Sequence, residues 1–435
     1  MKLKLSTMAI SLFAGLSMIS MVNADEVTGL ITKKQFDEIF PLSNGEHLKA
    51  EYTKAYKQFK DSLPEYAAAA QKCQKYEDMK DWSGQAKCLQ ENAPNYGKSR
   101  ATLDELAGKL QNCPAIMVVD NSGKKVDFSG EKPDPSTIKS IKTLYTYENF
   151  AKTTPYFPGF LSMSGGRHNA KRELAALLAN VQQETTGLCF ASETPFDILE
   201  KLNSPADFSK ITNQQLAAWM NDDDKKALAG QGVTDLYSLN DVSRRKVIDY
   251  VLSVKKPKGK YCKWDANPQG EKDCLASPNY YYGRGAIQLS YPYNYIAFGN
   301  TDFVKKQGYD LLMHPSLVAD PSANQENRSS LLWGSAIWFW MTPQAPKPSA
   351  HAVMTNQWQP TEADIKNGRQ PGFGTVINII NGGLECGSSR GADKDVKAQN
   401  RIDAYKRILR IIGSSEDDNS KYPLDCKNSN NFNHQ

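Results

Sequence analysis

The chain has 435 residues, of which 40% are hydrophobic and 23% charged, and its formal net charge is +5. This composition is that of a globular protein and excludes whole-chain disorder, collagen and coiled coil. A net charge so close to zero on a chain this long argues against a nucleic-acid-binding protein, which would show a basic face. The length alone indicates roughly two or three domains.

The first 24 residues have the pattern of a secretory signal peptide. Lys2 and Lys4 precede an uncharged, mostly apolar stretch, and small residues allow cleavage after Ala24. The apolar stretch is shorter than the ~20 residues that a spanning helix needs, so a membrane anchor is the weaker interpretation. We therefore expect a secreted protein, extracellular or periplasmic, without membrane contact once the signal is removed.

Helices dominate the pattern along the chain. Residues 31–40 predict a short amphipathic helix, and residues 46–111 predict further helices, with Cys73 and Cys88 tying a hairpin. Residues 120–140 are rich in Gly, Pro and Asp and predict a loop. No internal repeat is present.

Residues 171–184 predict a helix with one buried face. Its apolar positions follow the i, i+3, i+4, i+7 spacing and are Leu174, Leu177, Leu178 and Val181. Gly187 follows soon after, and glycine commonly ends a helix. Further helices are expected over 196–255, 328–341 and 399–412, the second of them in the core, and a disulfide-stapled loop over 256–279. The tail from residue 414 to 435 is polar, and we expect it to be mostly unstructured except where Cys426 anchors it.

All eight cysteines lie beyond residue 70, and export leaves them free to pair. No Cys-x-x-Cys pair occurs and histidine is scarce, so a metal site is disfavoured and four disulfides are expected. The residues alone do not choose among the many pairings that eight cysteines allow.

Glu184 is a candidate general acid. It lies seven residues after Leu177 and three after Val181, which puts it on the buried face of its helix. Burial raises the pKa of a carboxyl, as a general acid working near neutral pH requires. The alternative is a glutamate at a helix end, in solvent or paired with Lys171 or Arg172.

Glu193 is the candidate partner of that acid. It follows nine residues later, beyond Gly187, and we expect it in more polar surroundings. Two carboxylates in different environments are what glycoside hydrolysis uses, one as acid and one as base. The spacing in sequence allows a wide gap between them but does not define it.

Two further segments carry polar side chains suited to sugars. Residues 280–295 are rich in tyrosine and include glutamine, serine and asparagine; aromatic faces stack on sugar rings, and the polar groups bond sugar hydroxyls. The alternative is a tyrosine-rich core segment. In residues 378–387, Asn381 opens a turn signal and Glu385 is a third acid or a partner for Arg401. The alternative there is a plain turn that caps a helix.

These segments together resemble glycoside hydrolase family 19, the chitinases. Glu184-Thr185-Thr186-Gly187 followed by Cys189-Phe190-x-x-Glu193 is similar to the family's acid–base segment, and residues 281–290 resemble its most diagnostic stretch. Residues 336–342, 346–353, 371–374 and 378–387 follow in the family's order. The resemblance is dense over roughly 140–412 and touches 31–40.

The resemblance implies a mainly α, two-lobed, lysozyme-like helical fold around a substrate cleft, and an inverting mechanism. It makes Glu184 the general acid, Glu193 the general base, and Ser290 a holder of the attacking water. The residues that would contact sugar or support the acid are Gln288, Tyr282, Tyr293, Asn294, Asn381, Glu385 and Arg401. The family's pairing would join Cys262 to Cys274 and Cys386 to Cys426; we expect Cys113–Cys189 and Cys73–Cys88 for the remainder.

The chain also departs from the family. Gln183 replaces the usual histidine before the acid, and the loop between the two glutamates is short, as in bacterial members. Two segments, about 41–140 and 194–260, are longer than the plant pattern. We therefore expect one catalytic domain, residues 25–413, enlarged by two insertions and followed by the tail that Cys426 ties down.

The function expected from these features is that of a secreted endo-chitinase, monomeric and without a cofactor, acting on chitin or chitooligosaccharides. One alternative is a peptidoglycan-cleaving lysin of the same fold, and another is a catalytically inactive carbohydrate-binding protein. Retention of both glutamates argues against the inactive protein, since losing either would be its simplest sign.

Overall fold

The computed structural model describes residue 27 and residues 29–432, apart from 194–195, 200–201, 203, 221, 256–260, 263–266, 277–278, 389 and 418. The expected signal peptide lies outside the described residues. The described chain is mostly helical, with one two-stranded sheet, so the mainly α fold class is confirmed. Within these residues no helix is both long and apolar enough to cross a membrane.

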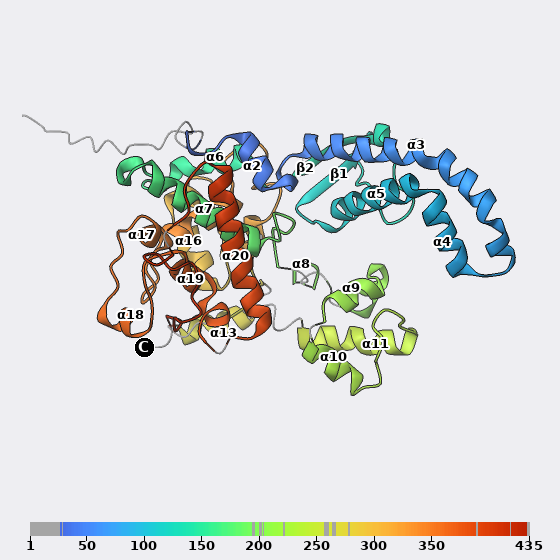
Figure 1. Cartoon of the computed structure of the whole chain (residues 1–435). Coiled ribbons are helices and arrows are strands. Elements are labelled where there is room, and N and C mark those ends of the chain that lie inside the picture. The colour runs from blue at the N-terminus through green and yellow to red at the C-terminus, as the bar shows by residue number, and fades with distance from the viewer. Residues whose placement is uncertain are drawn as a thin grey trace, which may run out of the picture.

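The elements form a body, an arm and a smaller helical lobe in Figure 1. The arm contains α3 (Gly45–Asp78), α4 (Trp82–Asn92), α5 (Pro94–Asn112) and the antiparallel strands β1 (Ile116–Asp120) and β2 (Ile138–Thr143). The lobe contains α8 (Phe196–Leu199), α9 (Asn213–Ala218), α10 (Asp222–Ala229) and α11 (Asp241–Tyr250). The remaining helices are α2 (Lys33–Ile39), α6 (Tyr147–Thr153), α7 (Arg167–Glu184), α13 (Pro268–Ala276), α14 (Pro292–Gly299), α15 (Asp302–Lys305), α16 (Leu331–Met341), α17 (Ala350–Met354), α18 (Glu362–Lys366), α19 (Phe373–Glu385) and α20 (Ala392–Ile411).

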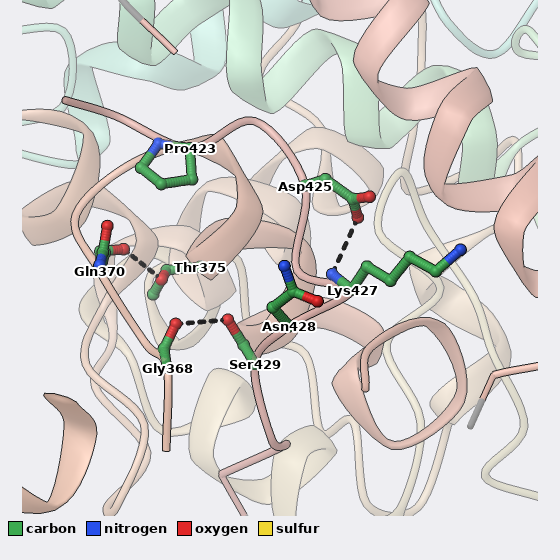
Figure 2. A pocket seen from close by; sticks show the side chains of 8 residues that line it. All are labelled: Gly368, Gln370, Thr375, Pro423, Asp425, Lys427, Asn428 and Ser429. Atoms are coloured by element: carbon green, nitrogen blue, oxygen red, sulfur yellow. Dashed lines mark hydrogen bonds between the residues drawn. The ribbon is translucent and has the colours of Figure 1, made fainter. Parts of the chain in front are cut away.

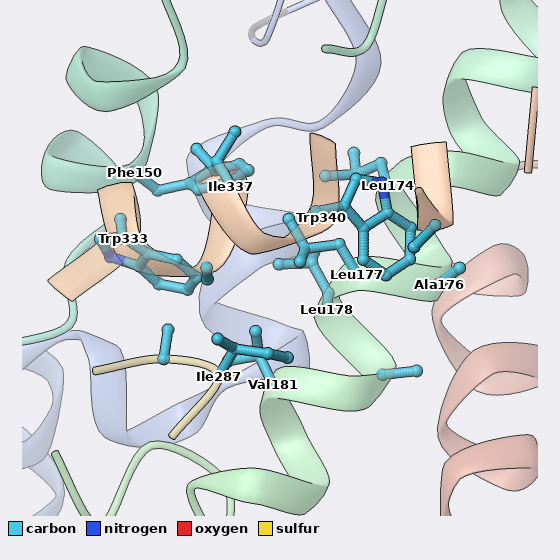
Figure 3. Close-up of a cluster of buried hydrophobic side chains, with 14 of the residues drawn as sticks. Phe150, Leu174, Ala176, Leu177, Leu178, Val181, Ile287, Trp333, Ile337 and Trp340 are labelled. Carbon is cyan, nitrogen blue, oxygen red and sulfur yellow. The ribbon is translucent and has the colours of Figure 1, made fainter. Parts of the chain in front are cut away.

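The body is built around α7 and the apolar helix α16. The apolar face predicted for α7 is fully buried, and Figure 3 shows Leu177 and Val181 of α7 in the same cluster as Trp333 and Trp340 of α16. Burying a large apolar side chain stabilises a fold by roughly 1.5–3 kcal/mol, so this cluster holds α7 rigidly. Helix α20 packs along α7 on another side. The carboxyl end of α7, where Glu184 lies, is therefore well supported.

The arm is connected to the body at its base. Its inner cluster includes Leu48, Leu103 and Ile141, and Cys189 of the loop after α7 belongs to the same cluster. The disulfide Cys113–Cys189 joins the end of α5 to that loop. The arm is thus fastened covalently to the segment between the two candidate catalytic glutamates.

The eight cysteines form the four expected pairs: Cys73–Cys88, Cys113–Cys189, Cys262–Cys274 and Cys386–Cys426. The segment 256–279 is not only a loop, because α13 occupies part of it. Pro268 is the first residue of this helix, a position where proline's missing N–H costs nothing. The last helix, α20, begins at Ala392, seven residues before the start expected from the sequence.

The expectation of a mostly unstructured tail is wrong. Asp417 forms an ion pair with Arg172 of α7 at 2.5 Å, with both side chains 1% exposed, and it also accepts a hydrogen bond from Tyr405. Phe432 is buried, and a hollow of about 220 Å³ lies between the tail and the start of α19. Figure 2 shows the side chains of Pro423 and Ser429 of the tail and of Thr375 of α19 that line it. The local composition of the tail could not indicate this, because its partners come from distant helices.

Candidate active site

A cleft with a volume of about 600 Å³ lies at the carboxyl end of α7. Its walls come from the loop after α7, residues 283–294, and the second half of α19. Seven of the residues predicted for catalysis or sugar contact line it: Glu184, Glu193, Gln288, Ser290, Tyr293, Asn294 and Asn381. The fold therefore brings together groups that lie far apart in the sequence.

Glu184 is the last residue of α7, and the chain turns sharply after it. Thr186 and Leu188 have left-handed φ angles of 52° and 72°, on either side of Gly187 at 67°. Arg401 donates a hydrogen bond to Oε1 of Glu184, whose side chain is 19% exposed. No other described residue has a hydrogen bond to this carboxyl in the structure, and Glu184 lines the cleft. The carboxylate of Glu184 thus pairs with Arg401, and not with solvent alone or with the nearby cations Lys171 and Arg172.

Arg401 connects three polar groups behind the cleft. Its guanidinium bonds both oxygens of Glu385 at 2.8 Å and Oδ1 of Asn180 at 2.9 Å, in addition to Glu184. Burial alone would lower the pKa of Arg401, but the charges of Glu184 and Glu385 raise it well above its usual range. Burial alone would likewise raise the pKa of Glu385, but its bonds to Arg401 lower it. Both groups stay ionised.

Glu385 and Arg401 are 1% exposed and do not line the cleft. They lie behind Glu184 in the charge network that the resemblance implies, and they are not positioned to contact sugar. Asn381 connects this network to the cleft, because its Nδ2 donates to Oε1 of Glu385 at 2.6 Å. The turn expected at Asn381 is a kink within α19, where φ is −141° and ψ is 31°.

Glu193 is held by backbone and by one tyrosine. Its N–H donates to the carbonyl of Gly283 at 2.7 Å, and the N–H of Gly283 donates back to Oε2 at 3.3 Å. The hydroxyl of Tyr261 lies 2.7 Å from both carboxylate oxygens. Burial raises the pKa of Glu193, the bonds from Tyr261 and Gly283 lower it, the charge of Glu184 raises it, and the net shift is upward. The expectation of more polar surroundings for Glu193 is therefore wrong.

Tyr261 is the functional residue that sequence reasoning missed. It is a single tyrosine beside Cys262, just beyond the segment 194–260 that is longer than the plant pattern. Its adjacency to a disulfide was the one available signal. Lys347 was also missed: its Nζ donates to the carbonyl of Ile379 at 2.9 Å in the cleft wall, and burial lowers its pKa.

The tyrosine-rich segment is divided between cleft and core. Tyr293 lines the cleft, whereas Tyr282 is 2% exposed and its ring centroid lies 3.7 Å from the guanidinium carbon of Arg284. The assignment of Tyr282 to sugar contact is therefore wrong, and its ring supports a buried cation instead.

The same segment requires glycine at position 285, since φ is 80° there and a Cβ would lie 2.3 Å from Oγ of Ser335.

The hydroxyl and amides that line the cleft are fixed by short backbone contacts. The hydroxyl of Ser290 donates to the carbonyl of Gln288 at 3.0 Å, and Nδ2 of Asn294 donates to the carbonyl of Ser290 at 2.9 Å. Gln344 donates to Oδ1 of Asn294 at 3.3 Å. Groups oriented in this way can bond sugar hydroxyls and a water without much reorganisation.

Tyr261→Phe is expected to change the pH profile of activity. Losing the hydroxyl removes a bond that lowers the pKa of Glu193, so that pKa rises further. If Glu193 is the base, it must be ionised, and the acidic limb of kcat/KM moves to higher pH. On that limb we expect roughly tenfold lower kcat/KM, since a hydrogen bond to a charged group contributes about 1.5–3 kcal/mol. The measurement is kcat/KM against pH.

The matched control is Tyr250→Phe, which removes a tyrosine–carboxylate bond of 2.9 Å to Asp224 in the helical lobe. This variant should keep the wild-type profile. A shift of the alkaline limb in Tyr261→Phe would instead make Glu193 the acid, and an unchanged profile would contradict a role for Tyr261.

A helical body with two carboxylates facing one cleft of this size defines the class of a glycoside hydrolase. Within that class the chain belongs to glycoside hydrolase family 19, because residues 135–241 and 248–426 match the family described as chitinase class I. The mainly helical element order agrees with the fold class that the resemblance implies.

Curated relatives agree with this assignment. An endochitinase of Brassica napus is 36% identical over 288 residues, 66% of each chain, and endochitinase B of Nicotiana tabacum is 37% identical over 294 residues, 67% of each chain. The chain thus spans about two thirds of the length of these relatives. The solved structure of chitinase C from Streptomyces griseus is 25% identical, covering 65% of this chain and 90% of that chain with a TM-score of 0.38.

The family match begins at residue 135, so helices α3, α4 and α5 lie before it. It includes most of the second segment expected as an insertion and leaves out residues 242–247.

Proposed function

We propose that this chain is an endo-chitinase that hydrolyses β-1,4 links between N-acetylglucosamine units by an inverting acid–base mechanism. The observation that carries the proposal is that Glu184 and Glu193 line one cleft in different surroundings. Glu184 accepts a hydrogen bond from Arg401, and Glu193 accepts one from Tyr261. A pair of carboxyl groups in unlike environments is the chemical requirement of glycoside hydrolysis.

In this mechanism Glu184, which lines the cleft, protonates the leaving glycosidic oxygen. Glu193 removes a proton from water, and the upward shift of its pKa makes it a stronger base as long as it is ionised. Ser290 holds that water, and Gln288, Asn294 and Asn381 bond the sugars. Arg401 and Glu385 keep Glu184 in place from behind.

The proposal extends to the setting of the enzyme. Residues 25–413 form one catalytic domain enlarged by two insertions, and the protein is secreted and monomeric. Secretion is supported by the signal-peptide pattern of the first 24 residues and by four disulfides, which form and persist in oxidising compartments.

The test is a parallel assay on colloidal chitin, chitosan and purified peptidoglycan, followed by proton NMR of fresh chitooligosaccharide products. We expect hydrolysis of chitin above the other two polymers, with the α-anomer formed first. Preference for peptidoglycan would establish the lysin, and an initial β-anomer would contradict inversion. Binding without turnover on all three polymers would establish an inactive carbohydrate-binding protein.

A further inference from the structure

The far end of the arm has few buried contacts that would stabilise its structure. Residues 71–92 comprise the end of α3, a short turn and α4, and α4 has no buried residue. An isolated helix of this length is marginal in water, so the disulfide Cys73–Cys88 supplies the constraint that a core would otherwise provide. This end lies outside the family match. The role of this segment therefore lies in its exposed surface and not in a buried core.

Two large apolar side chains are exposed at this end. Trp82, the first residue of α4, is 63% exposed, and Met79 in the turn before it is 65% exposed. Leaving an indole in water forgoes the stabilisation that its burial would contribute. Exposed apolar groups rimmed by polar residues mark interaction surfaces.

A polar hollow lies in the same segment. It has a volume of about 420 Å³, lies between α3 and α4, and is lined by Lys72, Lys75, Tyr76, Lys87, Glu91 and Asn92 among others. A Cβ on Gly84 would lie 2.6 Å from Cδ1 of Tyr76, so the Tyr76 ring packs against the backbone two residues from Trp82.

The charge of this surface favours a neutral ligand. Four lysines (Lys72, Lys75, Lys80 and Lys87) are balanced by four acids (Glu77, Asp78, Asp81 and Glu91). Three of these lysines and one of the acids line the hollow, but the segment as a whole has no net charge and offers no extended basic face to a polyanion such as nucleic acid or an acidic lipid layer. Five amide side chains lie in the same stretch: Gln71, Gln74, Gln85, Gln90 and Asn92. Amides and aromatic faces together suit hydroxyl and N-acetyl groups on sugar rings.

We propose that residues 71–92 form a second carbohydrate-binding surface, with Trp82 as its stacking platform, that holds the enzyme on insoluble polysaccharide. The identity of the polymer, chitin, rests on the proposed function. In Figure 1 α4 lies at the end of the arm, far from α7 and α19, so this surface acts as a separate anchor and does not extend the cleft. It raises the local concentration of enzyme on the solid substrate without touching the reacting bond.

The test measures adsorption to insoluble chitin in a Glu184→Gln background, so that hydrolysis does not remove the polymer. Trp82→Ala should raise the dissociation constant roughly tenfold, a size typical of one aromatic contact, and Trp82→Phe should recover part of it. The matched control is Tyr237→Ala, which removes an aromatic side chain that is 71% exposed in the helical lobe. Circular dichroism and the melting temperature should be unchanged in every variant.

Turnover of soluble chitooligosaccharides by otherwise wild-type enzyme separates this inference from the proposed function. We expect Trp82→Ala to hydrolyse soluble substrate normally and insoluble chitin more slowly. Normal adsorption of Trp82→Ala would overturn the anchor while leaving the enzyme assignment intact. Adsorption abolished by about 0.5 M NaCl would also overturn it, because stacking on a neutral polymer is not screened by salt. No turnover of soluble substrate by the wild type would contradict the proposed function instead.

Discussion

Glu184→Gln is expected to lower kcat on chitooligosaccharides by about 10³-fold while changing oligosaccharide affinity only a few-fold. Glutamine has the shape of glutamate, and its Oε1 can still accept the hydrogen bond from Arg401. It has no acidic proton to give to the leaving oxygen, so the interaction lost exists only in the transition state. Steady-state kinetics on a soluble oligosaccharide, with calorimetric titration for affinity, measures both quantities.

Substrates with different leaving groups distinguish the roles of the two glutamates. In an aryl glycoside with a strongly acidic phenol, the phenolate leaves without being protonated, so Glu184→Gln should regain much of its lost rate on that substrate. Glu193→Gln should not recover, because the attacking water still needs a base. If only Glu193→Gln regained its rate on the aryl glycoside, Glu193 would be the acid and Glu184 the base. The raised pKa of Glu193, taken by itself, would favour that assignment. Glu148→Gln, which removes a surface pair with Lys33 outside the cleft, serves as the control.

Much of this site is visible in the sequence because its parts are local. Helix α7 follows from a repeat of apolar residues every three or four positions, and its glycine stop lies just beyond its observed end. The candidate role of Glu184 is predicted from its position at the end of that repeat. The cleft residues Gln288, Ser290 and Asn294 come from one short segment, so a single motif indicates all three.

What sequence could not show depends on contacts between distant segments. The pKa of Glu193 is set by burial and by Tyr261, 68 positions away, and no periodicity predicts that contact. The order of the tail rests on Arg172, 245 positions before Asp417. Tyr282 and Tyr293 have the same side chain in one motif, and only the fold puts one in the core and the other in the cleft.

Arg401→Met is expected to lower the free energy of unfolding by about 4 kcal/mol at pH 7 and to reduce turnover strongly. Methionine fills a similar volume but leaves the buried carboxylate of Glu385 without its cation, and Glu184 without its only described hydrogen-bond partner. Urea unfolding at several pH values, together with kcat, measures both effects.

The pH dependence follows from the lowered pKa of Glu385. A carboxyl whose pKa is lower in the folded protein contributes stability at pH values above its unfolded pKa, and that contribution is lost as the pH falls through the folded pKa. Without Arg401, burial is opposed only by the hydrogen bond from Asn381 and the charge of Lys397, so the pKa of Glu385 is higher in the variant and less of this contribution remains at pH 7. The gap between wild type and variant should therefore be wide at pH 7 and narrow in acid.

Two further variants show whether the charge itself is responsible. Arg410→Met removes an exposed arginine from the same helix, where its partner Glu416 is also exposed, and should cost less than about 1 kcal/mol. The double variant Arg401→Met/Glu385→Gln leaves no unpaired charge behind the cleft and should be more stable than Arg401→Met alone. Its turnover should stay low, since Glu184 still lacks the guanidinium that holds it. A double variant no more stable than the single one would mean that Arg401 stabilises the fold by packing, and the ion pair with Glu385 would then not be what supports the acid.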